Sequence, residues 1–97
     1  MRLIVSDEVK AKLLNRHKVR IEEVEQCFVN VVRTFLEDTR PEHQTEPVTE
    51  WFIAETDAGR RLKVCFMQFS DGTVEIKTAY KPDPVEEKLY ERHAQRI

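Results

Sequence analysis

The sequence has little of what marks several special classes of protein. Its 97 residues include two glycines, four prolines and two cysteines. So few glycines and prolines, beside 35% charged and 40% hydrophobic residues, exclude a disordered or low-complexity chain. Sixteen basic and eighteen acidic residues give a net charge of −2, so a nucleic acid could be held only by a local basic patch. We expect a single domain over residues 1–97.

Two further absences concern the membrane and cofactors. The apolar runs, such as residues 64–67, are far shorter than the roughly 20 residues that span a bilayer. The first residues lack a basic and then apolar targeting signal, so we expect a cytoplasmic protein with no membrane partner. Cys27 and Cys65 have neither CxxC spacing nor a nearby pair of histidines. They predict two reduced, half-buried thiols, no metal site and no cofactor.

Apolar spacing in the first half predicts two helices after a short strand. The run at residues 3–5 is followed by Ser6, which can cap a helix whose first turn is acidic. Apolar residues recur at intervals of three and four up to about His17, and again over residues 21–31. These helices are expected to form a hairpin. Alternating β-branched and aromatic residues then predict a strand over residues 32–38.

The second half predicts three strands joined by tight loops. Residues 39–49 are polar, contain two prolines and show no periodicity, which indicates an exposed loop. Strands are expected over residues 51–56, 61–69 and 73–81. Their connectors, Asp57-Ala58-Gly59 and Ser70-Asp71-Gly72, each end in glycine, which is typical of a three-residue hairpin loop with a left-handed glycine.

A capping sequence starts the last predicted helix. Asp83 is an N-cap acid, Pro84 suits the first helical position, and Glu86 completes a capping box. The helix would carry Val85, Leu89 and His93 along one side.

Loop length sets the strand register, and the register sorts side chains onto two faces. Three-residue loops place Leu62 opposite Tyr80, Val64 opposite Thr78 and Phe66 opposite Ile76, so this face is apolar. We expect the helices to cover it. The predicted fold is therefore α+β, with a twisted antiparallel sheet of about four to five strands and the N-terminal helical hairpin and C-terminal helix on one face.

The other face is then expected to be open, with cations around an apolar strip. Cations neutralise phosphates and an indole can stack on a base, so this face could bind RNA. Two alternatives remain open. Solubility alone predicts charge on an open face, and an exposed apolar strip is typical of a contact with a protein partner or a second copy of the chain. The cations are Arg61, Lys63, Lys77 and Lys81, and the strip is Trp51, Ile53, Cys65 and Met67.

Three segments of the chain resemble a known family. They are residues 16–28, which begin Arg-His-Lys-Val, residues 59–64 (Gly-Arg-Arg-Leu-Lys-Val), and residues 76–81 (Ile-Lys-Thr-Ala-Tyr-Lys) before a glutamate-rich helix with Tyr90. The chain is similar to the BrnT-type toxins, small members of the RelE-like ribonuclease group. Lys18 and Tyr80 depart from the family pattern, which has glycine and arginine there.

The resemblance implies an RNA-cleaving toxin of a toxin–antitoxin pair, with RNA or the ribosome and a cognate antitoxin as partners. Cleavage without a metal needs a base for the 2′-hydroxyl, an acid for the leaving oxygen and cations for the charge on phosphorus. The candidate catalytic residues are Arg61, Lys77, His17 and Tyr80, and the candidate RNA-binding residues are Arg60, Lys63, Lys81 and Trp51.

Two of these residues also have a structural interpretation. His17 at a helix end also suits a capping or surface role, and the register above turns Tyr80 toward the core. The second functional hypothesis is a non-catalytic interaction domain of the same fold, which would bind an antitoxin or a second copy through the strip of Trp51, Ile53 and Met67.

Overall fold

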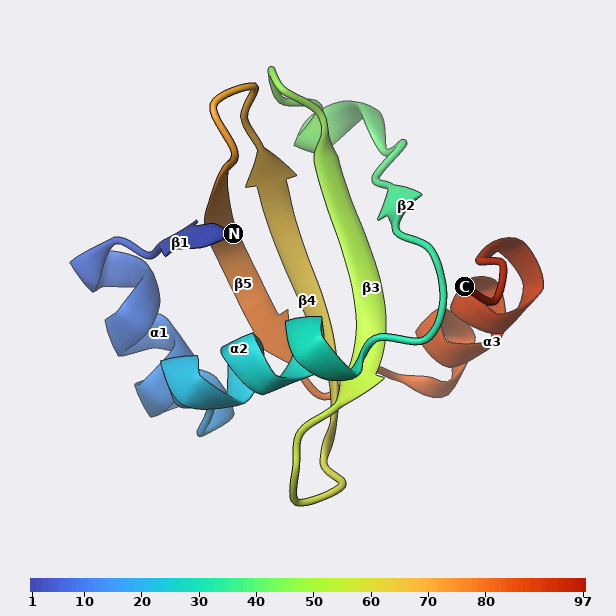
Figure 1. Ribbon diagram of the computed structural model, residues 1–97, viewed down its shortest axis with the longest axis horizontal. Coiled ribbons are helices and arrows are strands. Elements are labelled where there is room, and N and C mark those ends of the chain that lie inside the picture. Colours follow the sequence, from blue (N-terminus) through green and yellow to red (C-terminus); the bar gives the residue numbers. More distant parts are fainter.

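A computed structural model describes residues 1–97 except the side chain of His43, and these residues form an α+β fold (Figure 1). Within them, one mixed sheet has five strands in the order β1-β5-β4-β3-β2. In chain order the elements are β1 (Arg2–Ile4), α1 (Asp7–His17), α2 (Ile21–Asn30), β2 (Leu36–Glu37), the 3-10 helix η1 (Pro41–His43), β3 (Thr49–Glu55), β4 (Arg61–Gln68), β5 (Thr73–Tyr80) and α3 (Pro84–His93).

The two N-terminal helices confirm the prediction from apolar spacing. Ser6 caps α1 by accepting a hydrogen bond from the Val9 amide at 3.1 Å. The helix ends at His17, and Lys18 follows with a left-handed φ of 55°. In α2, the buried residues are Val24, Cys27 and Phe28.

The strand predicted over residues 32–38 is wrong in its extent. Only β2 joins the sheet, and it pairs Leu36 with Trp51 of β3. The residues before it bond to the C-terminus instead: the Thr34 amide donates to the Gln95 carbonyl at 2.8 Å, and Val32 accepts from Ile97 at 3.0 Å. A distant segment therefore takes the hydrogen bonds that a longer β2 would have used.

The prediction of a fully antiparallel sheet is also wrong, because β1 runs parallel to β5 and pairs Leu3 with Val74. After β1 the chain forms both N-terminal helices and then the strands β2, β3 and β4 before it reaches β5 beside β1. Such a long connection permits parallel pairing, and no local pattern in the sequence encodes it.

The glycine-ended loops confirm the predicted hairpins, with φ of 86° at Gly59 and 88° at Gly72. The β3–β4 register is the one that a three-residue loop at residues 57–59 sets; Ala54, for example, lies opposite Leu62. Between β4 and β5 the register agrees with the prediction only near the loop. Phe66 pairs with Ile76 but Cys65 pairs with Thr78, so Lys77 is an extra residue in a β-bulge.

The bulge moves Tyr80 to the other face of the sheet. Beyond it, Lys63 lies opposite Tyr80 and Val64 opposite Ala79. The prediction that Tyr80 faces Leu62 and turns toward the core is therefore wrong. Directly opposite residues share a face, so Tyr80 lies beside Lys63, whose ammonium is 5.7 Å from the centroid of its ring.

The face predicted to be the core is confirmed. Leu62, Val64 and Phe66 are completely buried, and α2 crosses this face (Figure 1). Phe28 of α2 contacts Phe66 edge to face, with ring centroids 5.2 Å apart. Phe35 and Phe52 complete this aromatic cluster, so α2 is held to the sheet by packed rings.

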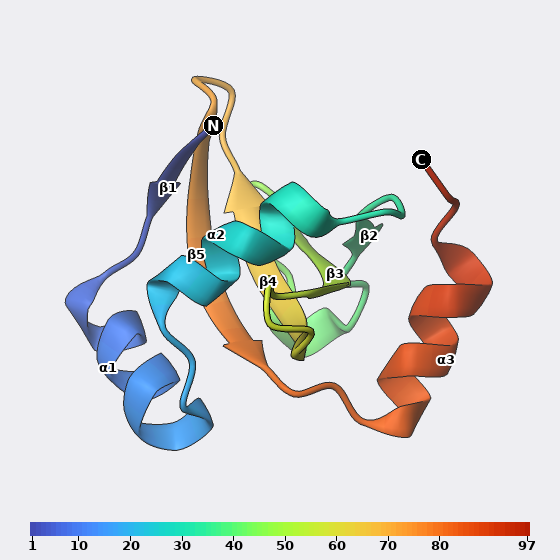
Figure 2. The same cartoon turned by 60° about the horizontal axis from the view of Figure 1, so that its bottom comes forward.

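The C-terminal helix lies on the opposite face, against the prediction that all helices share one side. The sheet separates α1 from α3 in Figure 2. Tyr90 of α3 contacts Trp51, with ring centroids 5.6 Å apart. The strip expected to be exposed is buried: Trp51 is 9%, Ile53 3% and Met67 8% accessible. Two residues predicted to lie along one side of this helix, Val85 and Leu89, are exposed.

We predict that Gly72→Ala destabilises the protein by about 1 to 2 kcal/mol, because φ is positive there and an added Cβ would meet no atom within 4 Å. The cost is therefore one of backbone conformation alone. Gly72→Asn should cost clearly less, since asparagine tolerates this conformation better. Urea unfolding of both variants tests this; equal losses for the two would contradict it.

Candidate functional site

The start of α3 fixes the residue around which the candidate site is built. The Asp83 carboxylate accepts from the Glu86 amide at 2.8 Å, and Glu86 Oε1 accepts from the Asp83 amide at 3.0 Å. This is the predicted capping box. Because one carboxylate oxygen of Glu86 is used by the cap, the direction of the whole side chain is set, and the second oxygen lies against the sheet.

That second oxygen, Glu86 Oε2, is shared by two groups from neighbouring strands. Lys63 Nζ donates to it at 2.7 Å, and Tyr80 Oη donates to it at 2.7 Å. Lys63 is only 6% accessible, and its ammonium lies 4.5 Å from the centre of the Trp51 ring, a cation–π contact. We call Lys63, Tyr80 and Glu86 the Glu86 cluster.

The Glu86 cluster shifts the pKa of each of its members. Burial is the largest single effect and by itself would lower the pKa of Lys63 and raise that of Glu86. Their mutual hydrogen bond, together with the other hydrogen bonds and charges around them, outweighs burial, so the Lys63 pKa is raised and the Glu86 pKa lowered. Burial and the bond to Glu86 raise the pKa of Tyr80. At neutral pH the cluster therefore holds an ammonium, a carboxylate and a protonated phenol.

A cavity of about 540 Å³ lies beside the cluster, and we call it the Trp51 cavity. Its lining includes Arg40, which makes a two-pronged hydrogen bond to Asp38, at 3.1 and 2.8 Å. The loop after β2 and the helix α3 thus both contribute to the cavity wall. The lining residues are Leu36, Glu37, Asp38, Thr39, Arg40, Trp51, Lys63, Glu86, Leu89 and His93.

Sequence reasoning missed Asp38, Arg40 and the part that Glu86 plays at the site. Glu86 was expected only as a cap, and Arg40 lay in a segment expected to be a featureless loop. The spacing of Asp38 and Arg40 suits a local ion pair, but nothing in the sequence indicates that this pair lines the same cavity as Lys63.

The structure brings two predicted catalytic residues together and gives one predicted RNA-binding residue partners within the protein. The His17 ring lies against the Tyr80 ring, with centroids 5.6 Å apart. Arg60 instead holds the end of α1, because its guanidinium donates to the carbonyls of His17 at 2.8 Å and Lys18 at 2.6 Å. Arg60 therefore stabilises the helix end.

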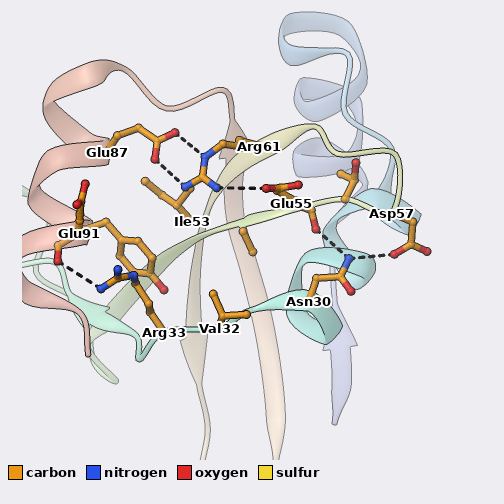
Figure 3. A pocket seen from close by; sticks show the side chains of 12 residues that line it. Asn30, Val32, Arg33, Ile53, Glu55, Asp57, Arg61, Glu87 and Glu91 are labelled. Atoms are coloured by element: carbon orange, nitrogen blue, oxygen red, sulfur yellow. Dashed lines mark hydrogen bonds and ion pairs between the residues drawn. The ribbon is translucent and has the colours of Figure 1, made fainter. Parts of the chain in front are cut away.

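Arg61 does not present a free charge. Glu87 of α3 accepts from its guanidinium at 2.7 and 2.8 Å, and Glu55 on the neighbouring strand is farther, at 3.7 Å (Figure 3). Lys77, on the bulge, is exposed and lies 3.7 Å from Glu75, and Lys81 is exposed just after β5. The four predicted cations thus form no continuous open patch, because Lys63 is buried and Arg61 is paired with Glu87 of α3.

Figure 3 shows a second cavity, of about 680 Å³, between Arg61 and the linker after α2. Polar side chains in it bond to the protein itself: Asn30 donates to the Glu55 carbonyl at 2.9 Å, and Arg33 to the Ala94 carbonyl at 3.0 Å. Tyr90 also lines it, and its buried hydroxyl has no hydrogen-bond partner among the described residues.

The cysteines are not candidates for catalysis. Both are buried and free, and burial raises the pKa of Cys27 and of Cys65 to about 11. Each stays a thiol at neutral pH, whereas a nucleophile needs the thiolate. Among the side chains that the structure describes, no group of three or more histidine, cysteine or acidic residues could hold a metal ion. None of the described helices is long and apolar enough to cross a bilayer.

Comparison with known proteins adds no family. No protein-family model matches the sequence, and no curated protein is similar to it. The function therefore has to be argued from the Glu86 cluster and the cavity beside it.

We predict that Glu86→Gln lowers the free energy of unfolding by about 2 to 4 kcal/mol, because it leaves the Lys63 ammonium buried without its carboxylate. Glu87→Gln is the matched control: its ion pair with Arg61 is more exposed and should be worth less than about 1 kcal/mol. Urea unfolding at pH 7 compares them. Equal losses would contradict the structural role of the cluster.

The same pair predicts a pH dependence. The Glu86 pKa is lowered from 4.5, so its contribution is present above pH 4.5 and disappears as the pH falls through the lowered value. The Lys63 pKa is raised from 10.5, so its contribution disappears as the pH rises beyond 10.5. Glu86→Gln should therefore flatten the acid side of the stability curve, measured by thermal melts from pH 3 to 7.

Proposed function

We propose that this protein is a BrnT-like member of the RelE-like toxin group that binds RNA and cleaves it without a metal at the Trp51 cavity. One observation carries the proposal: Lys63, expected to bind RNA, and Tyr80, expected to be catalytic, both donate to one oxygen of Glu86 beside a cavity of about 540 Å³. A fixed ammonium and a protonated phenol next to a cavity are two of the groups that such a reaction needs.

Each member of the site has a separate role in this proposal. Lys63, held charged by its raised pKa, stabilises the negative charge that develops on phosphorus. Tyr80, held protonated, gives its proton to the departing 5′-oxygen. Arg40 uses Nε and one terminal nitrogen for its two hydrogen bonds to Asp38, and its remaining guanidinium N–H groups can donate to a neighbouring phosphate. Glu86 positions both Lys63 and Tyr80 and does not contact the RNA.

The site differs from the family pattern at position 80. Tyr80 stands where the family has arginine, which removes a strong phosphate ligand. The bulge at Lys77 turns Tyr80 toward Lys63, and Arg40 reaches the same cavity from the loop after β2. One lysine and one arginine thus remain for the phosphate, without the residue that the family pattern supplies.

We predict that Tyr80→Phe lowers the rate of RNA cleavage by about 100- to 1,000-fold and leaves RNA binding within a few-fold, because only a proton donor is lost. Cleavage of a labelled single-stranded RNA is measured with EDTA present, and the product should end in a 2′,3′-cyclic phosphate. Lys12→Met, which removes an exposed lysine from α1, is the control and should keep the wild-type rate.

Two results would overturn this function. One is a wild-type protein that neither binds nor cleaves RNA at low salt, where phosphate contacts are strongest. The other is a Tyr80→Phe variant that cleaves at the wild-type rate, which would move the chemistry to another part of the molecule.

A second candidate is a non-catalytic interaction domain of the same fold. It is favoured by the pairing of Arg61 and Lys63 with acids of α3 and by the exposure of two apolar residues of that helix, Val85 at 66% and Leu89 at 43%. The partner would be a cognate antitoxin or a second copy of the chain. Binding through Trp51, Ile53 and Met67 is not retained, because these side chains are buried.

A further inference from the structure

The Glu86 cluster provides a cation and an acid but no effective base. Glu86 accepts hydrogen bonds from Lys63, from Tyr80 and from the Asp83 amide. These bonds lower its pKa, and a carboxylate stabilised in its ionised form takes up a proton poorly. If RNA is cleaved here, the proton of the 2′-hydroxyl has to go to another group that reaches the Trp51 cavity.

His93 is placed to be that group. It lies in the last turn of α3 and lines the Trp51 cavity together with Glu86 and Leu89. Positions 86, 89 and 93 fall on one face of a helix, because they are spaced by three and four residues. Among the side chains that the structure describes, His93 is the one imidazole in the lining, and imidazole is the side-chain base best suited to neutral pH.

The two ends of this helix face suit an in-line displacement. Seven residues separate Glu86 from His93, which is about 10 Å along a helix axis. At one end of this helix face Glu86 accepts the hydrogen bond of the Tyr80 hydroxyl, and His93 lies at the other end; Glu86 and His93 both line the cavity. In phosphoryl transfer the attacking and leaving oxygens lie roughly in line on opposite sides of phosphorus, so a base and an acid at opposite ends can each reach one oxygen.

We propose that His93 is the general base that activates the ribose 2′-hydroxyl for cleavage at the Trp51 cavity; this inference rests on the proposed function. The neutral imidazole takes the 2′-hydroxyl proton as the 2′-oxygen bonds to phosphorus. The bond from phosphorus to the 5′-oxygen breaks, its electron pair stays on that oxygen, and Tyr80 supplies the proton. The products are a 2′,3′-cyclic phosphate and a free 5′-hydroxyl, and exchange with water restores both side chains.

Charged groups of both signs line the same cavity as the imidazole of His93. The groups are Glu86 on α3, Lys63 on β4, Glu37 on β2, and Asp38 and Arg40 on the loop that follows.

The test measures RNA cleavage against pH for single alanine variants of all three histidines, His17, His43 and His93, with EDTA present. For a general base, cleavage by the wild type should fall on the acid side of neutrality. His93→Ala should be slower by about 100- to 10,000-fold, should lose this acid limb and should regain activity with added imidazole. Its RNA binding should stay within a few-fold of the wild type. Arg92→Gln, on the same exposed turn of α3, should retain the wild-type rate and pH profile.

The outcomes separate this inference from the function on which it depends. If the wild type cleaves RNA and His93→Ala keeps both its rate and its acid limb, His93 is not the base. Loss of the limb in His17→Ala or His43→Ala, with the limb retained in His93→Ala, would likewise exclude His93 as the base. If the wild type neither binds nor cleaves RNA, the proposed function itself fails.

Discussion

The carboxylate of Glu86 is the contact on which the C-terminal half of the structure depends. One oxygen closes the capping box of α3, and the other accepts from Lys63 and Tyr80 on the strands β4 and β5. The same side chain therefore begins the helix and attaches it to the sheet. Since Lys63 is buried, it needs this carboxylate as a partner. If the helix left the sheet, the Lys63 ammonium would be either exposed to solvent or buried without a counter-charge.

The two faces of the sheet are covered by different kinds of interaction. On one face, α2 packs phenylalanine rings against β3 and β4, which is an apolar contact of the usual kind. On the other, α3 buries little besides Tyr90 and is joined by the ion pairs of Glu86 and Glu87. Its apolar residues Val85 and Leu89 are exposed. This polar attachment is what leaves room for a cavity lined by charged groups.

A single extra residue decides which groups the cavity can use. Without the bulge at Lys77, the register set by the Gly72 loop would continue, and Tyr80 would lie among the core residues opposite Leu62. With the bulge, Tyr80 lies opposite Lys63 and reaches Glu86. Bulges commonly re-aim a side chain next to a functional site, and here the shift brings a phenol, an ammonium and a carboxylate together.

Features of the fold that arise from neighbouring residues were predictable from the amino-acid sequence. The cap at Ser6, the capping box at Asp83 and the glycines at positions 59 and 72 each act within a few residues, and the apolar spacing of α1 and α2 is equally local. The core face followed from the loop lengths. These features could be predicted because short-range geometry and a repeating period leave few alternatives.

Contacts between distant segments set which face α3 covers, where the register shifts and which cations remain free. The parallel pairing of β1, the hydrogen bonds between residues 32–34 and the C-terminus, and the meeting of Arg40 and Lys63 at one cavity all join segments far apart in the chain. The glutamates of α3 are evident in the sequence. The same local pattern would result whether they faced solvent or paired with Lys63 and Arg61 on the sheet. Their place was set by the competition between hydration and ion pairing across the whole fold, which no short segment encodes.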